Sequence, residues 1–363
     1  MPRELTIRGQ RVADDSDCYV VAEIGHNHQG SVQTCKEVFR AAKDCGVDAV
    51  KLQKRDNRTL YTREYYDRPY ENENSFGKTY GLHREALEFG IDEYRELAAY
   101  AHDLDLTFFA TVFDFPSADF AAEIGLPAFK MASGDLKNTP LLTHVAKFGR
   151  PMIISTGASL LADVQRAYEA VRPLNSQIAI LQCTASYPAA FEELDLRVIE
   201  TYRSSFPDAV VGLSCHDSGI AMPVAAFVLG ARIIEKHFTL NRAMKGTDHA
   251  FSLEPVGMKK VVRDLRRVRV ALGDGTKRFH PSEEGAYVKM GKTLVAARDL
   301  PAGHLVVRGD IAARSPGGGL PPYELDRLLG RRLVEPIAED QALTHAVFAD
   351  ESREGASAER SSA

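Results

Sequence analysis

Short apolar runs alternate with longer amphipathic segments through most of the chain, and this alternation is the strongest guide to its fold. Eight of the runs are rich in β-branched and aromatic residues, which is typical of buried strands. Segments between them, such as Ser31–Cys45, Asp92–Asp105 and Leu161–Val171, carry apolar residues at helical spacing and are predicted helices. The predicted strands are Tyr19–Ile24, Ala49–Lys54, Leu106–Phe113, Ala128–Ala132, Met152–Ser155, Ile178–Cys183, Ala209–Ser214 and Arg232–Phe238.

Eight strand–helix units with nearly continuous apolar strands predict a parallel sheet that is covered on both faces. Right-handed crossovers close such a sheet most simply into a (β/α)8 TIM barrel. A doubly wound open sheet is the alternative fold. It is less favoured because the polar sequence Gly25-His26-Asn27-His28 follows the first strand, in place of the glycine-rich turn of a dinucleotide-binding fold.

The pattern also divides the chain into regions. We expect a barrel domain over residues 1–276, a linker over 277–291, a small β-rich domain over 292–349 and a disordered tail over 350–363. The strand-like runs of the β-rich domain are Thr293–Ala297, Leu305–Val307 and Arg332–Val334. A long insertion, Asp56–Gly90, follows the second strand at the end of the barrel where substrates bind, so it is predicted to be a substrate lid.

Composition narrows the class of protein. The chain of 363 residues has 45 Lys and Arg and 50 Asp and Glu. Because it also has no run of basic residues, we do not expect a nucleic acid as its partner. The start of the chain is polar and no apolar stretch approaches about 18 residues, so we expect neither a signal peptide nor a membrane span, and a cytoplasmic location. Five cysteines without CxxC spacing are expected to be free thiols, of which only Cys215 lies in a polar cluster and the others serve as apolar fillers.

Polar residues gather at the C-terminal ends of the predicted strands, where the active sites of barrels lie. Aiming cations, hydroxyls and imidazoles at one rim costs desolvation unless they have partners, so a purely structural barrel gives no reason for the pattern. The residues are Glu23, Lys51, Gln53, Thr111, Lys130, Ser133, Ser155, Thr184, Tyr187, Ser214, His216, Glu235 and His237.

Two kinds of ligand site are predicted from these ends. His216 and His237 lie at the ends of adjacent predicted strands and can share one divalent ion, since imidazole with oxygen ligands suits Mn, Fe, Co or Zn. Two structural, hydrogen-bonded histidines are the alternative. Lys51 and Lys130 each interrupt an apolar strand and need an anion, which predicts a phosphate ester held with nearby serines, although a single serine after a strand is often only a helix cap. A Schiff-base lysine, as in class I aldolases, is the mechanistic alternative and needs no metal.

Taken together, these motifs resemble the sialic acid synthase family, and within it the animal-type N-acetylneuraminate-9-phosphate synthases. The resemblance runs nearly end to end. The C-terminal sequences VAARDLPAGHLV (295–306) and RSPGGGLPP (314–322) resemble the antifreeze-like (SAF) domain of that family. The barrel sequences that carry it are AEIGHNHQG (22–30), VKLQK (50–54), RPYENENSFGKTYGLHREALEF (68–89), FKMASGD (129–135), RPMIISTG (150–157), LQCTASYP (181–188), VGLSCHDSGIA (211–221), EKHFTL (235–240) and KGTDHAFSLEP (245–255).

The resemblance implies that phosphoenolpyruvate is condensed with N-acetylmannosamine or its 6-phosphate, in a reaction that depends on a divalent metal, Mn²⁺ or Mg²⁺. It implies His216 and His237 as metal ligands and catalytic groups, Glu23 as a proton-transfer or sugar-binding group, and Lys51, Lys130, Ser133, Ser155 and Ser214 as phosphoenolpyruvate ligands. Gln53, Tyr187, Glu235 and Asp248 are then further substrate contacts. Arg314 matches an arginine that reaches the sugar's acyl group in the other subunit, which implies a domain-swapped homodimer.

The lid sequence indicates which sugar accepts phosphoenolpyruvate in the expected reaction. Its sequence around Lys78, His83 and Arg84 resembles the enzymes that take the 6-phosphosugar, so these side chains are expected to receive a second phosphate. Two positions depart from the family: Cys215 stands where bacterial members often have Asp, and Ala185 replaces a polar residue before Tyr187. A synthase of another nonulosonic acid, such as legionaminic or pseudaminic acid, is the enzymatic alternative, and a non-catalytic carbohydrate- or ice-binding protein is the alternative from another class.

Overall fold

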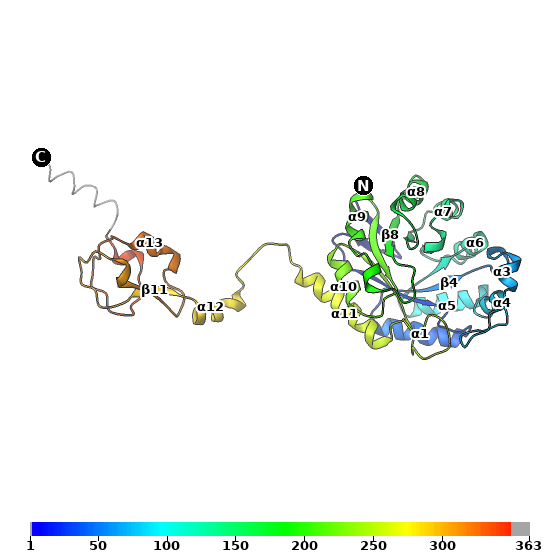
Figure 1. Ribbon diagram of the computed structural model, residues 1–363, viewed down its shortest axis with the longest axis horizontal. Coiled ribbons are helices and arrows are strands. Elements are labelled where there is room, and N and C mark those ends of the chain that lie inside the picture. Colours follow the sequence, from blue (N-terminus) through cyan, green and yellow to red (C-terminus); the bar gives the residue numbers. More distant parts are fainter. Residues whose placement is uncertain (1, 350–363) are drawn as a thin grey trace. The chain divides into compact units, whose positions relative to one another are not determined.

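A computed structural model describes residues 2–349 of the chain; the predicted disordered tail, 350–363, lies outside the described residues. The chain divides into two compact units, with the boundary between Gly273 and Asp274. Figure 1 shows the first unit as a strand barrel surrounded by helices. In the described residues, no helix is both long enough and apolar enough to cross a bilayer.

The first unit is a closed barrel of eight parallel strands, in the order β10-β3-β4-β5-β6-β7-β8-β9, which confirms the predicted TIM barrel. Every predicted strand is present, with ends that are identical or differ by one residue. The strands are β3 (Tyr19–Gly25), β4 (Ala49–Lys54), β5 (Thr107–Val112), β6 (Phe129–Met131), β7 (Met152–Ser155), β8 (Ile178–Cys183), β9 (Val210–Cys215) and β10 (Ile233–His237).

The outer helices bury one apolar face each against the barrel. In α1, for example, Ser31 caps the first turn by accepting from Thr34 N, and Gly46 ends the helix in a left-handed conformation. The helices of the first unit are α1 (Val32–Cys45), α5 (Ile91–Asp103), α6 (Phe115–Ile124), α7 (Thr139–Ala146), α8 (Leu161–Val171), α9 (Val198–Ser205), α10 (Ala221–Val228) and α11 (Pro255–Ala271), and the lid adds α2 (Asn57–Leu60), α3 (Arg63–Asp67) and α4 (Tyr80–Glu85).

A hairpin that the sequence analysis did not predict covers the N-terminal end of the barrel. Its strands, β1 (Glu4–Ile7) and β2 (Gln10–Ala13), pair antiparallel. Leu5, Ile7 and Val12 join the inward-facing residues of the lower barrel in one apolar cluster. The hairpin therefore closes the end opposite the polar strand ends, and the sequence analysis had treated this segment only as polar.

The second unit has its own apolar core, built around Leu294, Leu333 and Ile337, and one short sheet of β11 (Thr293–Ala296) and β12 (Ile311–Arg314). The predicted runs Leu305–Val307 and Arg332–Val334 form isolated bridges rather than strands. The predicted linker, 277–291, belongs to this second unit and contains a helix, α12 (Glu284–Met290), and α13 (Leu325–Leu328) lies further along.

Candidate active site

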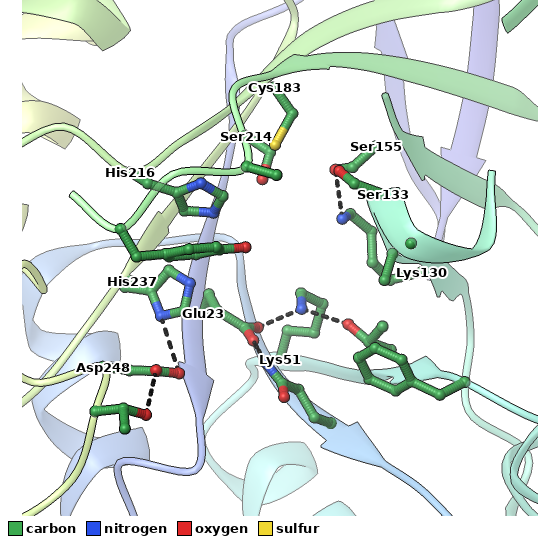
Figure 2. A pocket seen from close by; sticks show the side chains of 18 of the residues that line it. Glu23, Lys51, Lys130, Ser133, Ser155, Cys183, Ser214, His216, His237 and Asp248 are labelled. Atoms are coloured by element: carbon green, nitrogen blue, oxygen red, sulfur yellow. Dashed lines mark hydrogen bonds and ion pairs between the residues drawn. The ribbon is translucent and has the colours of Figure 1, made fainter. Parts of the chain in front are cut away.

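One inward-facing residue from each barrel strand forms the floor of a polar cavity of about 560 Å³ at the C-terminal end. All eight side chains are buried, and the outward-facing residues between them contact the helices. Cys183, which the sequence analysis took for an apolar filler, belongs to this ring (Figure 2). The eight residues are Glu23, Lys51, Thr111, Lys130, Ser155, Cys183, Ser214 and Glu235.

The two lysines have both hydroxyl and carboxylate partners (Figure 2). Lys51 Nζ donates to Thr111 Oγ1 at 2.6 Å and forms an ion pair with Glu23. Lys130 Nζ donates to Ser155 Oγ at 2.6 Å and lies 3.4 Å from Glu235 Oε1. Two ammonium groups and two carboxylates thus share a site that water hardly reaches, where an unpaired charge would be costly.

Burial and neighbouring charges shift the pKa values of the two buried carboxyl groups, Glu23 and Glu235, in opposite directions. Burial raises the pKa of Glu23 to about 6, with Glu235 adding to the rise and Lys51 opposing it. Burial would also raise the pKa of Glu235, but Lys130 and Lys51 lower it to about 2. Burial lowers the pKa of Lys130 against the pull of Glu235. Glu23 is therefore suited to exchange a proton near neutral pH, whereas Glu235 remains a fixed negative charge.

The imidazoles of His216 and His237 face the same cavity, with ring centroids 5.4 Å apart. His216 Nδ1 donates to the carbonyl of Thr184 at 2.9 Å, which leaves the Nε2 lone pair available. His237 Nδ1 is buried without a hydrogen bond, 3.8 Å from Asp248 Oδ2. Burial lowers the pKa of His216 to about 3 and that of His237 to about 4, so both rings are neutral at pH 7.

Two neutral imidazoles with accessible lone pairs fit a divalent ion. Within residues 2–349, no group of three or more His, Cys, Asp or Glu side chains is arranged to hold a metal. A metal at His216 and His237 would therefore have two protein nitrogens and would take its other ligands from substrate oxygens and water, which is the open arrangement that Lewis-acid chemistry needs.

A buried ion pair fixes the strand ends that carry these histidines. Lys236 Nζ donates to Asp217 Oδ1 at 2.8 Å and to its carbonyl at 2.6 Å, and both side chains are 1% exposed. Cys215 Sγ donates to the same Asp217 oxygen at 2.5 Å. Cys215 thus takes part in this structural contact and is absent from the cavity lining, whereas Ala185 lines the cavity.

Other predicted residues lie around the ring. Ser133 Oγ accepts from Gly157 N at 2.9 Å, and Gln53 Nε2 donates to Glu23 Oε1 at 2.7 Å. Tyr187 lies against His216 with ring centroids 4.1 Å apart. Asp248 lines the cavity as well. The structure therefore brings together the strand-end residues that the sequence analysis named, except Thr184, which does not line the cavity and whose carbonyl accepts from His216 Nδ1.

Gly25 shows how closely this part of the cavity is packed. The register between β3 and β4 shifts between Glu23 and Gly25, and Gly25 has a φ of 55°. A side chain there would come within 3.3 Å of the polar tips of Glu23, Gln53 and Asp248. A glycine at this bend lets three functional side chains converge.

The lid residues are placed less uniformly. Arg84 lines the cavity, but Lys78 is exposed and does not. His83 is buried inside the lid, where its Nδ1 accepts from Phe76 N at 3.1 Å. Arg55, which follows β4, lines the cavity and was missed by the sequence analysis; its charge directly after a predicted strand was the available signal.

Arg314 belongs to the second unit, at the end of β12, and forms ion pairs with Asp340 and Glu339 of that unit. The residues that line the cavity all come from the first unit. The contact of Arg314 with a substrate of another subunit remains a prediction.

Comparison with known proteins agrees with the geometry. Residues 38–277 match the NeuB family, and residues 291–348 match the SAF domain. N-acetylneuraminate-9-phosphate synthase of Homo sapiens is 40% identical over 345 residues, which cover 94% of this chain and 96% of that protein. N,N'-diacetyllegionaminic acid synthase of Legionella pneumophila is 34% identical over 322 residues, 87% of this chain and 90% of that protein.

Solved structures give the same result. N-acetylneuraminic acid (sialic acid) synthetase of Leptospira borgpetersenii superposes with a TM-score of 0.69 at 29% identity, covering 79% of this chain and 95% of that one. Spore coat polysaccharide biosynthesis protein SpsE of Bacillus subtilis superposes with a TM-score of 0.65 at 30% identity, covering 96% and 99%. The chain belongs to the NeuB family, with a SAF domain at its C-terminal end.

Proposed function

We propose that the chain condenses phosphoenolpyruvate with the open-chain aldehyde of an N-acetylmannosamine-type sugar, giving N-acetylneuraminate or its 9-phosphate and inorganic phosphate. The relatives named N-acetylneuraminate-9-phosphate synthase, from Homo sapiens, Mus musculus and Drosophila melanogaster, support this reaction class, as does membership of the NeuB family.

The observation that carries the proposal is the pair of buried lysines that faces the two neutral imidazoles in one cavity. Phosphoenolpyruvate has a phosphate and a carboxylate, and Lys51 and Lys130 supply two cations for them. The hydroxyls of Ser133, Ser155 and Ser214 add donors at the same ring. A site with this donor set suits a small substrate that carries two anionic groups.

In the reaction, C3 of phosphoenolpyruvate forms a bond with the aldehyde carbon, and the aldehyde oxygen gains a proton. A water molecule adds at C2, and the C2 oxygen–phosphate group leaves as inorganic phosphate, so that C2 becomes the ketone. Glu23, whose pKa is raised to about 6, is the group that holds or moves a proton near the acceptor. Gln53 donates to Glu23 and fixes its orientation.

His216 and His237 would hold the divalent metal, which polarises the aldehyde when it is bound. The chain's own contribution is to keep both imidazoles neutral through burial and to fix their strand ends through Asp217 and Lys236. Mn²⁺ and Mg²⁺ are the ions that we propose.

Phosphate release measures the function directly. We expect release only when phosphoenolpyruvate, the amino sugar and Mn²⁺ are all present, and loss of release after chelation. Titration calorimetry with Mn²⁺ gives a second readout: His216→Ala and His237→Ala are each expected to weaken binding about 100-fold, whereas His102→Ala, 79% exposed at its side chain, leaves it unchanged. No phosphate release with any hexosamine would favour the non-catalytic alternative.

The acceptor can differ among relatives, since N,N'-diacetyllegionaminic acid synthases are also similar to this chain. A synthase of another nonulosonic acid is therefore the second candidate. Comparing initial rates on N-acetylmannosamine, its 6-phosphate and a 2,4-diacetamido hexose separates the two, because the second candidate requires the diacetamido sugar to be the best acceptor.

We also propose that the active form is a domain-swapped homodimer in which Arg314 contacts the acceptor in the other subunit. Arg314 is 43% exposed at its side chain, so it is accessible to a partner. Mixing two inactive variants, Arg314→Ala and Lys130→Met, should restore about a quarter of wild-type activity if the swap occurs, because a mixed dimer then has one intact site. Failure of the mixture to regain activity, although mixed dimers form, would contradict the swap.

A further inference from the structure

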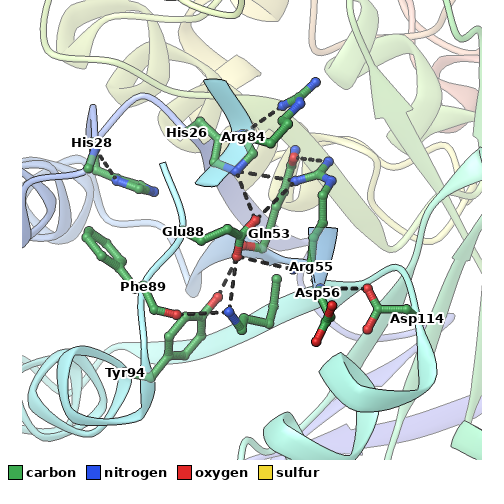
Figure 3. Close-up of polar contacts among 12 residues, drawn as sticks. His26, His28, Gln53, Arg55, Asp56, Arg84, Glu88, Phe89, Tyr94 and Asp114 are labelled. Atoms are coloured by element: carbon green, nitrogen blue, oxygen red, sulfur yellow. Dashed lines mark hydrogen bonds and ion pairs between the residues drawn. The ribbon is translucent and has the colours of Figure 1, made fainter. Parts of the chain in front are cut away.

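Arg55, which follows β4, is held in one place by its surroundings (Figure 3). Its backbone N donates to Glu88 Oε2 at 3.2 Å, and the N of the next residue, Asp56, donates to Asp114 Oδ2 at 2.8 Å. Its guanidinium lies 3.8 Å from the ring centroid of Phe113, and its side chain is 7% exposed. The fold therefore fixes both the backbone and the side chain of Arg55.

The guanidinium of Arg55 contacts the side chain of Gln53, near the end of β4 (Figure 3). Arg55 Nη2 donates to Gln53 Oε1 at 2.7 Å. Gln53 Nε2 in turn donates to Glu23 Oε1 at 2.7 Å. Within residues 2–349, no other hydrogen bond reaches the side chain of Gln53. Gln53 thus links a fixed cation to the carboxyl group of Glu23.

The amide of Gln53 can hold an ionised Glu23 in only one of its two orientations. Turning the amide by a half-turn exchanges its oxygen and its nitrogen. A carboxylate only accepts hydrogen bonds, so Glu23 needs the NH2 group, and a guanidinium only donates, so Arg55 needs the oxygen. In the turned amide, the NH2 group would face the N–H groups of Arg55, and the oxygen would face the carboxylate. Arg55 therefore fixes the orientation in which Gln53 donates to Glu23.

A change in Gln53 would reach the reacting groups, because they are closely packed. Glu23 Oε1 accepts from Gln53, and the other carboxyl oxygen forms the ion pair with Lys51. Gln53 Nε2 and Asp248 Oδ2 would each lie 3.3 Å from a Cβ placed on Gly25. Without the donor from Gln53, only Lys51 would hold the carboxyl group, which could then turn away from the acceptor.

We propose that Arg55 is a positioning residue for the condensation: it orients Gln53 so that Gln53 holds the carboxyl group of Glu23 at the acceptor. This inference rests on the proposed function. The alternative is that Arg55, which lines the cavity, binds the acceptor directly. The two roles change different constants, because loss of binding raises KM, whereas loss of orientation lowers kcat at nearly constant KM.

Initial rates with N-acetylmannosamine and with its 6-phosphate, in the presence of phosphoenolpyruvate and Mn²⁺ and with each substrate varied in turn, separate kcat from KM. Arg55→Met should lower kcat about 10-fold to 100-fold, by the same factor on each sugar that the wild type uses, because Glu23 is no longer held. KM for the acceptor and for phosphoenolpyruvate should change less than about threefold. Arg55→Lys keeps a donor for Gln53 and should recover part of kcat.

A double-mutant cycle tests whether Arg55 acts through Gln53. Gln53→Met should lower kcat about as much as Arg55→Met. Adding Arg55→Met to Gln53→Met should then lower kcat less than about threefold further, since the link to Glu23 is already broken. Losses that multiply in the double variant would show two independent roles and would overturn the positioning role.

Arg58→Met is the matched control. Like Arg55, Arg58 lies near a carboxylate, Glu85 at 3.1 Å, and stacks on a ring, that of Tyr66 at 4.0 Å. Its side chain is 69% exposed and does not line the cavity, so kcat and both KM values should stay as in the wild type. Melting temperatures show which variants are folded. Arg55→Lys carries the test if Arg55→Met does not fold, with a loss in kcat of about threefold or more.

A wild-type kcat in every folded variant of Arg55 would overturn the positioning role. A rise in KM for the acceptor that accounts for the loss, or a loss confined to the 6-phosphate, would also overturn it, because Arg55 would then bind the acceptor itself. In these cases the wild type still joins the two substrates, and the proposed function stands. Absence of a joined product from the wild type with every acceptor would contradict the proposed function itself, and the positioning role with it.

Discussion

The two ends of the barrel are built from the same eight strands but have opposite chemistry. At the N-terminal end, inward-facing residues are apolar and meet Leu5, Ile7 and Val12 of the hairpin. Two residues further along the same strands, the next inward-facing layer is charged or polar. The pairs from one layer to the next are Val21 and Glu23, Ala49 and Lys51, Phe109 and Thr111, Ala128 and Lys130, Ile153 and Ser155, and Ile233 and Glu235.

The N-terminal layer of the barrel therefore serves stability, and the C-terminal layer of the same strands serves the proposed function. The lower layer buries apolar surface, which stabilises the fold in proportion to its area. The upper layer buries two lysines and two glutamates as ion pairs, and replacing a whole buried ion pair by apolar groups of similar size is often neutral or stabilising. Under the proposed function the charges are retained because the ligand requires them, so mutation of the upper layer should lower activity and mutation of the lower layer should lower stability.

The largest expected effect is on the upper layer. Lys130→Met should lower kcat/KM for phosphoenolpyruvate about 100-fold to 1,000-fold, because one cation of the substrate site is lost. The melting temperature should fall only slightly, since Lys51 Nζ, 3.8 Å from Glu235 Oε1, still compensates the charge of Glu235. Steady-state kinetics and thermal unfolding measure the two quantities, and a variant with unchanged kcat/KM would remove Lys130 from the substrate site.

The converse is expected for the lower layer. Ile7 is 0% exposed, so Ile7→Ala should lower the free energy of unfolding by about 2–4 kcal/mol. KM for phosphoenolpyruvate should stay at the wild-type value. Urea denaturation followed by circular dichroism measures the loss, and Thr6→Ala, on the exposed side of the same strand, is the matched control. Loss of substrate affinity with intact stability would contradict the separation of the two ends.

A smaller effect follows from the pKa of Lys130, which burial lowers from its ordinary value of 10.5. As pH rises through this lowered pKa, the ammonium loses its proton and its charge, so KM for phosphoenolpyruvate should begin to rise below pH 10.5. Above that pKa the rise should be about tenfold per pH unit. Lys130→Arg should move the rise in KM to higher pH. A KM that stays constant up to pH 10.5 would show that Lys130 does not bind the substrate as a cation.

The smallest effect concerns Cys215, whose thiol contacts Asp217 and does not line the cavity. Cys215→Ala should change kcat/KM for phosphoenolpyruvate less than about twofold. Titration with phosphoenolpyruvate in steady-state assays checks this, and a large rise in KM would show that this departure from the family reaches the substrate.

The barrel could be predicted from the sequence because its strands are continuous apolar runs and the polar residues after them converge by topology alone. The hairpin was missed because each of its strands has four residues, so the alternation of Leu5 and Ile7 with polar residues is too short to stand out as a strand. In the lid, sequence alone does not show which cation faces the cavity, because that depends on where α4 begins and how it packs. Arg55 was missed because its stacking on Phe113 joins two different strand ends.

Mass spectrometry of the product tests the central claim most directly. Wild-type protein with phosphoenolpyruvate, Mn²⁺ and N-acetylmannosamine 6-phosphate should form one new species whose mass equals both substrates plus water minus phosphoric acid, with an equal amount of phosphate released. Lys130→Met should form it far more slowly under the same conditions. Phosphate release without a joined product, or no consumption of phosphoenolpyruvate with any sugar, would contradict the assignment of the C-terminal end of the barrel as a condensing site.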